Sequence, residues 1–179
     1  GVMFNFSNGF YMKRICLLLG LTLVLAGCAS TNTDASKFAT LQNQRIKDGE
    51  NKHSLTFSTV NGKKLEIPIF TTPYKATHLV SAGTSSLDIQ VTHTSNTTEV
   101  VWASRFEVEI NLVAGEKYFI KANETNWCIN MTVVNAKGEE VSSKQSKPLY
   151  PFISMNHMKD RSLMERVLNK VKNAKCESI

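Results

Sequence analysis

Four histidines, at positions 53, 78, 93 and 157, are the first places to look for metal binding or acid–base chemistry. None of them lies three or four residues from another histidine or from a cysteine, so the sequence shows no metal-ligand spacing. His78 and His93 flank a predicted strand and could meet only through the fold. We therefore expect each histidine to lie at the surface, and we expect no metal and no cofactor.

Other catalytic patterns are also missing from the sequence. Glu107 and Glu109 share one face of a predicted strand, and paired carboxylates can act as acid and base when their pKa values are separated. On an alternating strand, however, such a pair is typical of a solvated outer face. The stretch Ser81-Ala82-Gly83-Thr84-Ser85 lacks the Gly-x-Ser-x-Gly signature of a nucleophile. No glycine-rich phosphate loop occurs either. The sequence therefore predicts no catalytic residue and no enzyme.

Cys28 has the most specific sequence context. Lys13 and Arg14 precede an apolar run over residues 15–25, and two small residues then lead to the cysteine. This is the three-part layout of a secretory signal peptide. The run is too short to span a bilayer, which needs roughly 20 apolar residues. Residues 1–11 carry no charge and fit poorly with the positive start of a signal, so we take Met12 as the initiator and residues 1–27 as extension plus signal.

The ending Leu25-Ala26-Gly27-Cys28 closely resembles the lipobox of bacterial lipoproteins. The resemblance implies that the signal helix is cut off before Cys28 and that this cysteine is acylated. Two or more acyl chains hold a protein stably at a membrane. Ala29 follows the cysteine, where aspartate would favour the inner membrane, so similarity to enterobacterial sorting implies an outer-membrane anchor with the domain facing the periplasm. The alternative is a plain cleaved signal, or a buried apolar helix, with Cys28 an incidental thiol.

Two further cysteines, Cys128 and Cys176, remain after Cys16 leaves with the signal and Cys28 is used by lipid. They form a single pair in an oxidising compartment. A disulfide between them would enclose roughly 50 residues and contribute about 4 kcal/mol by chain entropy. The alternative is one buried thiol and one exposed thiol near a frayed terminus.

After the signal, the chain divides into three parts that differ in composition and in the pattern of apolar residues. Residues 28–53 are polar and predict a lipid-anchored flexible tether, in which residues 36–46 could form a short helix. Residues 54–145 alternate between apolar and polar residues and predict a β domain. Residues 146–179 predict an extended segment followed by a C-terminal amphipathic helix.

The β domain is predicted to be a small antiparallel sandwich, or an open barrel, of about seven strands. Asn61-Gly62 is the strongest short hairpin signal, and residues 65–69 are expected to return as an edge strand because Pro68 lacks an amide donor. Turns are expected at residues 82–84, 114–116 and 135–138. The inward-facing residues of the clearest strands are Leu87, Ile89 and Val91, then Phe106, Val108, Ile110 and Leu112, and then Ile129, Met131 and Val133.

The C-terminal helix is predicted to start near Asn156 or Asp160 and to run to about Lys175. Its apolar stripe consists of Leu163, Met164, Val167, Leu168 and Val171, and lysines and arginines fill much of the remaining surface. The helix either packs on the sandwich with its basic face in solvent or lies on an anionic membrane or a partner.

The order of signals between Val60 and Val141 resembles a recurrent bacterial pattern. It contains an Asn-Gly-Lys hairpin, the segment Ala114-Gly115-Glu116-Lys117-Tyr118, a tryptophan (Trp127) leading into a strand, and the turn Ala136-Lys137-Gly138. This looks like small lipoproteins with PEGA-like domains, whose fold is similar to carboxypeptidase-regulatory and transthyretin-like sandwiches. The resemblance implies a non-catalytic surface module.

The charge of the chain and its two tryptophans further restrict the possible functions. Without the two cations of the predicted signal, 19 lysines and arginines stand against 15 acidic residues. The resulting net charge of +4 is spread along the chain, apart from the C-terminal segment, and does not indicate nucleic-acid binding. Trp102 and Trp127 either pack in the core or contact a glycan or partner. We therefore predict a non-enzymatic envelope interaction or structural module that offers an exposed strand edge, near Pro68 or the final strand, to another envelope protein or cell-wall component. The alternative is a lipoprotein that binds a glycan or lipid headgroup through the two tryptophans and the basic helix.

Overall fold

The computed structural model describes residues 35–95, 101–152 and 161–176. The predicted signal peptide, Cys28 and residues 96–100 lie outside this part of the chain. The described elements are mainly β. They are η2 (Ala35–Lys37), β1 (Phe38–Gln42), β2 (Gln44–Asp48), β3 (Asn51–Val60), β4 (Lys63–Lys64), η3 (Pro73–Lys75), β5 (Thr77–Ser81), β6 (Gly83–Ser95), β7 (Val101–Leu112), β8 (Lys117–Thr125), β9 (Cys128–Asn135), β10 (Gln145–Pro148), β11 (Tyr150–Phe152) and α2 (Arg161–Lys172).

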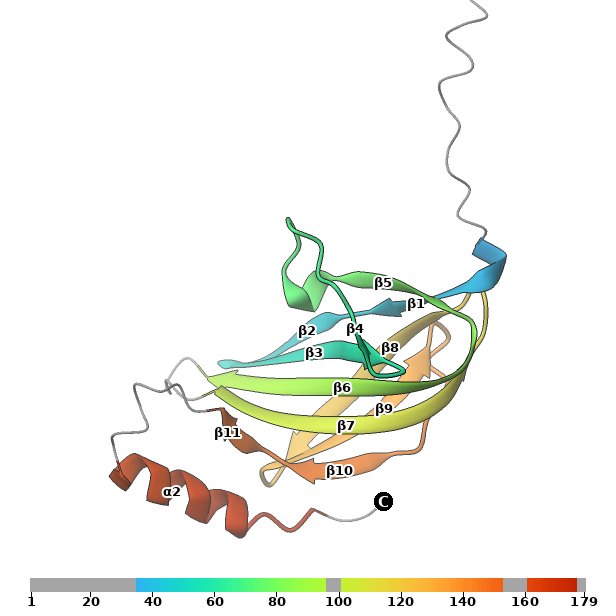
Figure 1. Ribbon diagram of the computed structural model, residues 1–179. Helices are drawn as coiled ribbons and strands as arrows, with labels where there is room; N and C mark the ends of the chain where they lie inside the picture. Colours follow the sequence, from blue (N-terminus) through green and yellow to red (C-terminus); the bar gives the residue numbers. More distant parts are fainter. Residues whose placement is uncertain (1–34, 96–100, 153–160, 177–179) are drawn as a thin grey trace, which may run out of the picture. The chain divides into compact units, whose positions relative to one another are not determined.

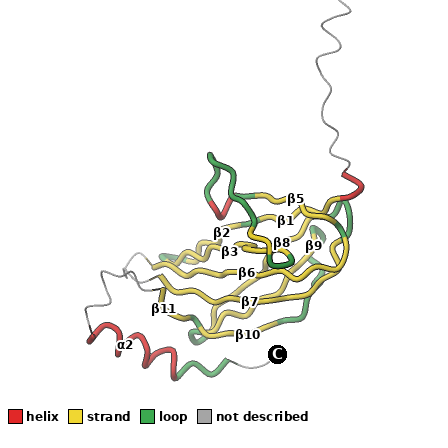
Figure 2. The backbone as a smooth tube through the Cα atoms, viewed as in Figure 1, coloured by secondary structure: helices red, strands yellow, loops and turns green. Residues whose placement is uncertain are grey.

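Two sheets face each other across one hydrophobic core (Figures 1 and 2). The first sheet has the order β10-β9-β8-β1-β5, and the second has the order β11-β7-β6-β3-β2 with β4 beside β3. Almost all described pairs are antiparallel, and β1 with β8 is parallel. The predicted β-sandwich class is therefore confirmed, with eleven described strands in place of about seven.

Strict alternation builds the core, as the sequence predicted for its clearest segments. Along β7 the exposed fractions of Phe106, Val108, Ile110 and Leu112 are all at or below 4%, and the residues between them face solvent. Glu107 and Glu109 lie on that outer face, as expected for a solvated strand surface. The apolar stripes of β6 and β9 face inward from the two different sheets.

The predicted hairpin at Asn61-Gly62 is present, and both residues have the positive φ angles of a type I′ turn, at 50° and 74°. The predicted return strand over residues 65–69 is wrong, because only β4 pairs with β3 after the turn. Beyond Leu65 the chain leaves the sheet: Ile69 is 93% exposed and Phe70 is 100% exposed. Pro68 accordingly lies in a loop and not on a sheet edge.

The predicted boundary between tether and domain is wrong. β1 and β2 fall within residues 28–53, and β1 lies in the middle of the first sheet, between β8 and β5. Ala39 and Leu41 are fully buried and alternate with the less buried Phe38, Thr40 and Gln42, so this stretch is a short strand and not the weak helix considered for residues 36–46. The polar residues before and after it hide this role in the sequence. The segment between Cys28 and the domain is therefore much shorter than predicted.

Two residues mark corners where the chain passes from one sheet to the other. Asn43 separates β1 in the first sheet from β2 in the second, and Leu149 separates β10 from β11 in the same way. Both are buried, and Leu149 donates its amide to the carbonyl of Trp127 over 2.9 Å. Strands that switch sheets are a known way of closing the sides of a sandwich. The predicted domain end at residue 145 is therefore also wrong, since β10 and β11 belong to the sheets.

At the C-terminus, Val171 of α2 packs against the core, whereas Leu168 is exposed. Of the predicted apolar stripe, Leu163, Met164 and Val167 lie outside the described side chains. Cys176 is joined to Cys128 by a disulfide, which ties the chain beyond α2 to the start of β9.

Candidate functional site

The strongest candidate site is a cluster of His53, His93 and Glu124, which we call the histidine–glutamate cluster. His53 continues the inward-facing stripe of β3 that includes Leu55 and Phe57. In the same way, His93 follows Val91 along β6, and Glu124 follows Ala122 along β8, each two residues further on. Because alternate residues of a strand face the same side, the three side chains enter the space between the sheets. The cluster thus joins two strands of one sheet to one strand of the other.

The reactive atoms of the cluster converge on one another. His53 Nε2 lies 2.9 Å from Glu124 Oε2, and His93 Nδ1 lies 2.5 Å from the same oxygen. The two ring nitrogens are 3.1 Å apart. The rings meet edge to face, with centroids 4.9 Å apart and planes at 81°. Each atom is therefore within reach of the other two.

The cluster is largely removed from solvent. The side chains of His53, His93 and Glu124 are 14%, 10% and 22% exposed. Burial on its own would raise the pKa of the Glu124 carboxyl, but hydrogen bonds from the two histidines and their charge when protonated outweigh it, so the pKa of Glu124 is lowered. The site therefore favours a carboxylate anion facing two imidazole nitrogens.

The expectation that the histidines lie at the surface is wrong for the three whose side chains are described. His93 and His78 are 8% and 7% exposed, and the side chain of His53 is 14% exposed. His157 lies outside the described residues. Local spacing could not reveal the cluster, because its members are 31 to 71 residues apart and meet only through strand register. The sequence does contain one indication of the cluster: each of its three residues lies two positions beyond the end of an inward-facing apolar stripe.

The two tryptophans predicted as possible contacts lie together. Their ring centroids are 5.0 Å apart with planes at 55°, and Trp102 is only 5% exposed. Trp102 is the register partner of His93, so the aromatic pair borders the histidine–glutamate cluster. Trp127 occupies the β8–β9 turn with a positive φ of 66°, a conformation that is rare for a bulky residue. The structure therefore places Trp102 in the core and not at a glycan-binding surface.

Asn43 organises a second buried polar site at its sheet corner. Its side-chain oxygen accepts the amide of Phe57 over 2.8 Å, and its amide group donates to the carbonyl of Pro73 over 2.8 Å. The same amide nitrogen lies 3.3 Å from His78 Nε2. Burial lowers the pKa of His78, and the neutral ring can accept from the Asn43 amide. The hydrogen bonds of Asn43 all join parts of the domain to one another, so this site has a structural role at the sheet corner.

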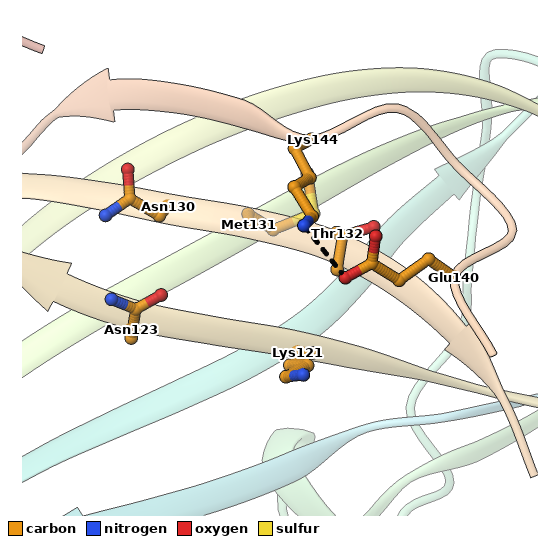
Figure 3. A pocket seen from close by; sticks show the side chains of 7 residues that line it. All are labelled: Lys121, Asn123, Asn130, Met131, Thr132, Glu140 and Lys144. Carbon is orange, nitrogen blue, oxygen red and sulfur yellow. Dashed lines mark ion pairs between the residues drawn. The ribbon is translucent and has the colours of Figure 1, made fainter. Parts of the chain in front are cut away.

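A hollow of about 330 Å³ lies on the outer face of β8 and β9 (Figure 3). Lys121, Asn123, Asn130 and Thr132 line it, and Lys144 reaches over it to Glu140 with an ion pair of 3.3 Å. Both partners of the pair are about half exposed, and such surface pairs contribute about 0–1 kcal/mol. The hollow is therefore a weaker candidate than the cluster.

A groove of about 640 Å³ separates β5 from the segment over residues 61–66. All five residues of β5 line it, and no described strand pairs with that edge of β5. Leu79 of β5 lines the groove and is 60% exposed, and Ile67, Ile69 and Phe70 are exposed in the loop that leads from the segment over residues 61–66 toward β5. We call the groove and these side chains the β5 face.

No protein-family model matches this chain, and neither a curated protein nor a solved structure matches it. The similarity to PEGA-like lipoprotein domains therefore stays an expectation from sequence. Among the described residues, no helix is long and apolar enough to cross a membrane.

Proposed function

We propose that this chain is a lipid-anchored envelope protein whose β-sandwich binds an extended segment of another envelope protein along the free edge of β5. The anchor is Cys28, and the compartment is the periplasmic side of the outer membrane. The role is non-enzymatic. The observation that carries the proposal is the β5 face, where an unpaired strand edge, a groove and exposed apolar side chains occur together.

An unpaired edge strand is a template for an added strand. Its backbone groups can pair with a partner, while pockets for alternate side chains give specificity. β5 pairs with β1 on one side only, from Thr77 to Ser81, and its other side borders the groove. The second edge strand on this side of the molecule, β2, carries Arg45 and Lys47, and charges of this kind discourage edge pairing. The edge of β5 is therefore the better acceptor for a partner strand.

The loop that carries Ile67, Ile69 and Phe70 is fixed by contacts of the residues that flank its tip. Thr71 donates its amide to the carbonyl of Pro68 over 2.9 Å, which closes a turn with Ile69 and Phe70 at its tip. Arg45 stacks 3.5 Å over the ring of Tyr74 at the other end of the loop. An apolar tip on a fixed base favours contact with a partner and is unfavourable in water alone.

The corrected tether limits where the partner can lie. Nine residues lie between Cys28 and Phe38, the start of β1, so ten residue-to-residue steps join the two. A fully extended chain spans at most about 3.3–3.6 Å per residue, so the start of β1 stays within about 35 Å of the lipid-modified cysteine. The proposed partner is therefore a membrane protein, or another protein held close to the membrane.

The alternative function, binding of a glycan or lipid headgroup through Trp102, Trp127 and the basic amphipathic C-terminal helix, has less support. Trp102 is 5% exposed, so its ring offers little surface to a ligand. Exposed cations do occur on α2, among them Arg166 and Lys172, and they keep a membrane-facing role for this helix open to test.

The test is site-specific crosslinking in intact cells of the native host. A photoreactive amino acid replaces Leu79 on β5 in one variant, and Tyr150, which is 57% exposed on β11, in a matched control. We expect a defined envelope protein to be captured from position 79 and not from position 150. A peptide spanning the crosslinked segment should then bind the purified chain and lose at least tenfold in affinity with Leu79→Lys. Equal capture from both positions, or peptide binding unaffected by Leu79→Lys, would refute the β5 face as the binding surface.

The anchor is tested separately with Cys28→Ala. We expect this variant to leave the membrane fraction while its purified form still binds the peptide. A Cys28→Ala protein that stays membrane-bound would contradict lipid anchoring and leave the β5 face unaffected.

A further inference from the structure

We propose that His53, His93 and Glu124 form a binding site for one divalent transition-metal ion, with Zn²⁺ as the expected ion. This inference is independent of the β5 face and of the lipid anchor. It rests on how the three ligand atoms converge, on their chemistry and on the rigidity of the strands that carry them.

Protons alone cannot make all three contacts between these atoms into hydrogen bonds. Three contacts of 2.9, 2.5 and 3.1 Å join the two ring nitrogens and the carboxylate oxygen into a triangle. Each ring nitrogen has a single in-plane position, which holds either a proton or a lone pair. If both nitrogens donate to Glu124, their two N–H groups face each other. If one nitrogen is bare, its lone pair faces the carboxylate. No proton placement therefore gives each contact a hydrogen bond of its own, whereas a central cation attracts all three atoms.

The spacing is close to that of a tetrahedral metal site. Zn²⁺ binds imidazole nitrogen at about 2.0–2.1 Å and carboxylate oxygen at about 2.0–2.2 Å, which places neighbouring ligand atoms about 3.3 Å apart. The three ligand atoms of the cluster are 2.5 to 3.1 Å apart. To reach the spacing of a metal site, each atom needs to move away from the centre of the triangle by a few tenths of an ångström. Side-chain rotation can supply such a shift without moving a strand.

The donor set also suits the ion. Two neutral imidazoles and one carboxylate are ligands that Zn²⁺ prefers, and imidazole also suits Cu²⁺ and Ni²⁺. The carboxylate offsets one of the two positive charges of the ion, which matters in a site that is mostly buried. Three protein ligands leave a coordination position for water or for a donor atom of another molecule.

Each ligand is held by strong local structure. His53 and His93 face each other across β3 and β6, in the part of their pairing that is unbroken from Asn51 to Phe57. Glu124 precedes the β8–β9 turn, which is held by contact of Trp127 with Trp102 and by the Cys128–Cys176 disulfide next to it. A site fixed in this way loses little entropy when the ion binds.

The experiment uses the full chain in detergent, purified without a histidine tag and stripped with a chelator. Co²⁺ is titrated first, because its visible absorption reports coordination and needs no variant protein. Zn²⁺ then displaces it, and elemental analysis gives the stoichiometry. We expect one ion per chain, a tetrahedral Co²⁺ spectrum and complete displacement by Zn²⁺.

The ligands are assigned with His53→Gln, His93→Gln and Glu124→Gln, and His78→Gln serves as a control. We expect each ligand variant to lower the affinity at least tenfold, and the double variant His53→Gln/His93→Gln to abolish binding. His78→Gln should bind as the wild type does, because His78 belongs to the Asn43 corner.

Two results would overturn the proposal. One is a wild-type chain that shows no Co²⁺ absorption and no bound Zn²⁺ at millimolar metal. The other is binding that persists unchanged in the double variant, which would place the ion elsewhere. Should a variant fold poorly, the wild-type imidazole NMR signals still decide, since those of His53 and His93 must shift on addition of Zn²⁺ and those of His78 must not.

Discussion

His53 and His93 are direct partners across β3 and β6, with their rings 4.9 Å apart, and a single carboxylate from the opposite sheet reaches both of them. The inward-facing apolar stripes of β3, β6 and β8 therefore end in polar residues at the same place between the two sheets. Such an arrangement is stable only while its members satisfy one another, because an unpaired buried polar group costs about 1–3 kcal/mol.

This dependence gives the first prediction, for protein kept free of metal with a chelator. His93→Leu should lower the free energy of unfolding by about 1–3 kcal/mol, because Glu124 loses a partner in a mostly buried position. Replacing all three residues by leucine should restore part of that loss or all of it, since an apolar set of similar volume leaves no charge unpaired. Urea unfolding followed by circular dichroism measures both effects.

The control for this series is Glu107→Leu, which changes a carboxylate on the solvent face of β7. It should alter the free energy of unfolding by less than about 0.5 kcal/mol. A triple variant that is less stable than His93→Leu alone would contradict the account of the cluster as a mutually dependent set.

The second prediction concerns Trp102 and Trp127, whose rings are 5.0 Å apart. Trp102→Ala should destabilise the fold by about 3–5 kcal/mol, as expected for removal of a buried tryptophan. A double-mutant cycle with leucine at the two positions should give a coupling of about 0.5–1.5 kcal/mol, the usual value for an aromatic pair. Additive effects of the two changes would show that the rings do not act as a pair.

The third prediction concerns the disulfide between Cys128 and Cys176. Cys176→Ser should lower the free energy of unfolding by about 4 kcal/mol, because the unfolded chain is no longer closed into a loop of that length. Reductant should lower the stability of the wild type by a similar amount and leave the serine variant unchanged. Thiol labelling in denaturant shows whether the reductant has opened the disulfide completely. If it has, and the free energy of unfolding of the wild type is unchanged, this role is contradicted.

Sequence reasoning could predict the strands in which large apolar residues alternate strictly. The stripes of β6, β7 and β9 are of this kind, and so is the Asn61-Gly62 hairpin. It failed at β1, whose buried face consists of only Ala39 and Leu41, because such a weak stripe gains its partners from strands distant in sequence. It failed again after Lys64, where alternating apolar residues suggested a strand but the chain leaves the sheet.

The candidate site was harder to predict than the fold. The sequence places His53, His93 and Glu124 far apart, and only the pairing of β3 with β6 and the facing of β8 across the core bring them together. The periodicity could have suggested that each side chain points inward. It could not have shown that three separate stripes end at the same place, since that depends on register and on the offset between the two sheets.

The last prediction is a pH dependence that arises from His78. Burial lowers the pKa of this residue, and Asn43 donates toward its Nε2, so the folded state favours the neutral ring. The unfolded chain takes up a proton near the ordinary histidine pKa of about 6.5, before the folded chain does. The unfolded state therefore binds more protons below that pH, and the free energy of unfolding falls as the pH drops. The slope from this residue is at most about 1.4 kcal/mol per pH unit.

The measurement compares wild type with His78→Leu by urea unfolding between pH 7.5 and 5, in the presence of a chelator. The variant should lose stability less steeply on acidification, because every other titrating group, including Lys63, Lys64 and Glu66 along the same groove, is common to both proteins. The difference between the two curves should be flat above about pH 7 and grow below the ordinary histidine pKa of about 6.5. A difference that stays constant across the whole range would show that His78 takes up its proton equally in both states.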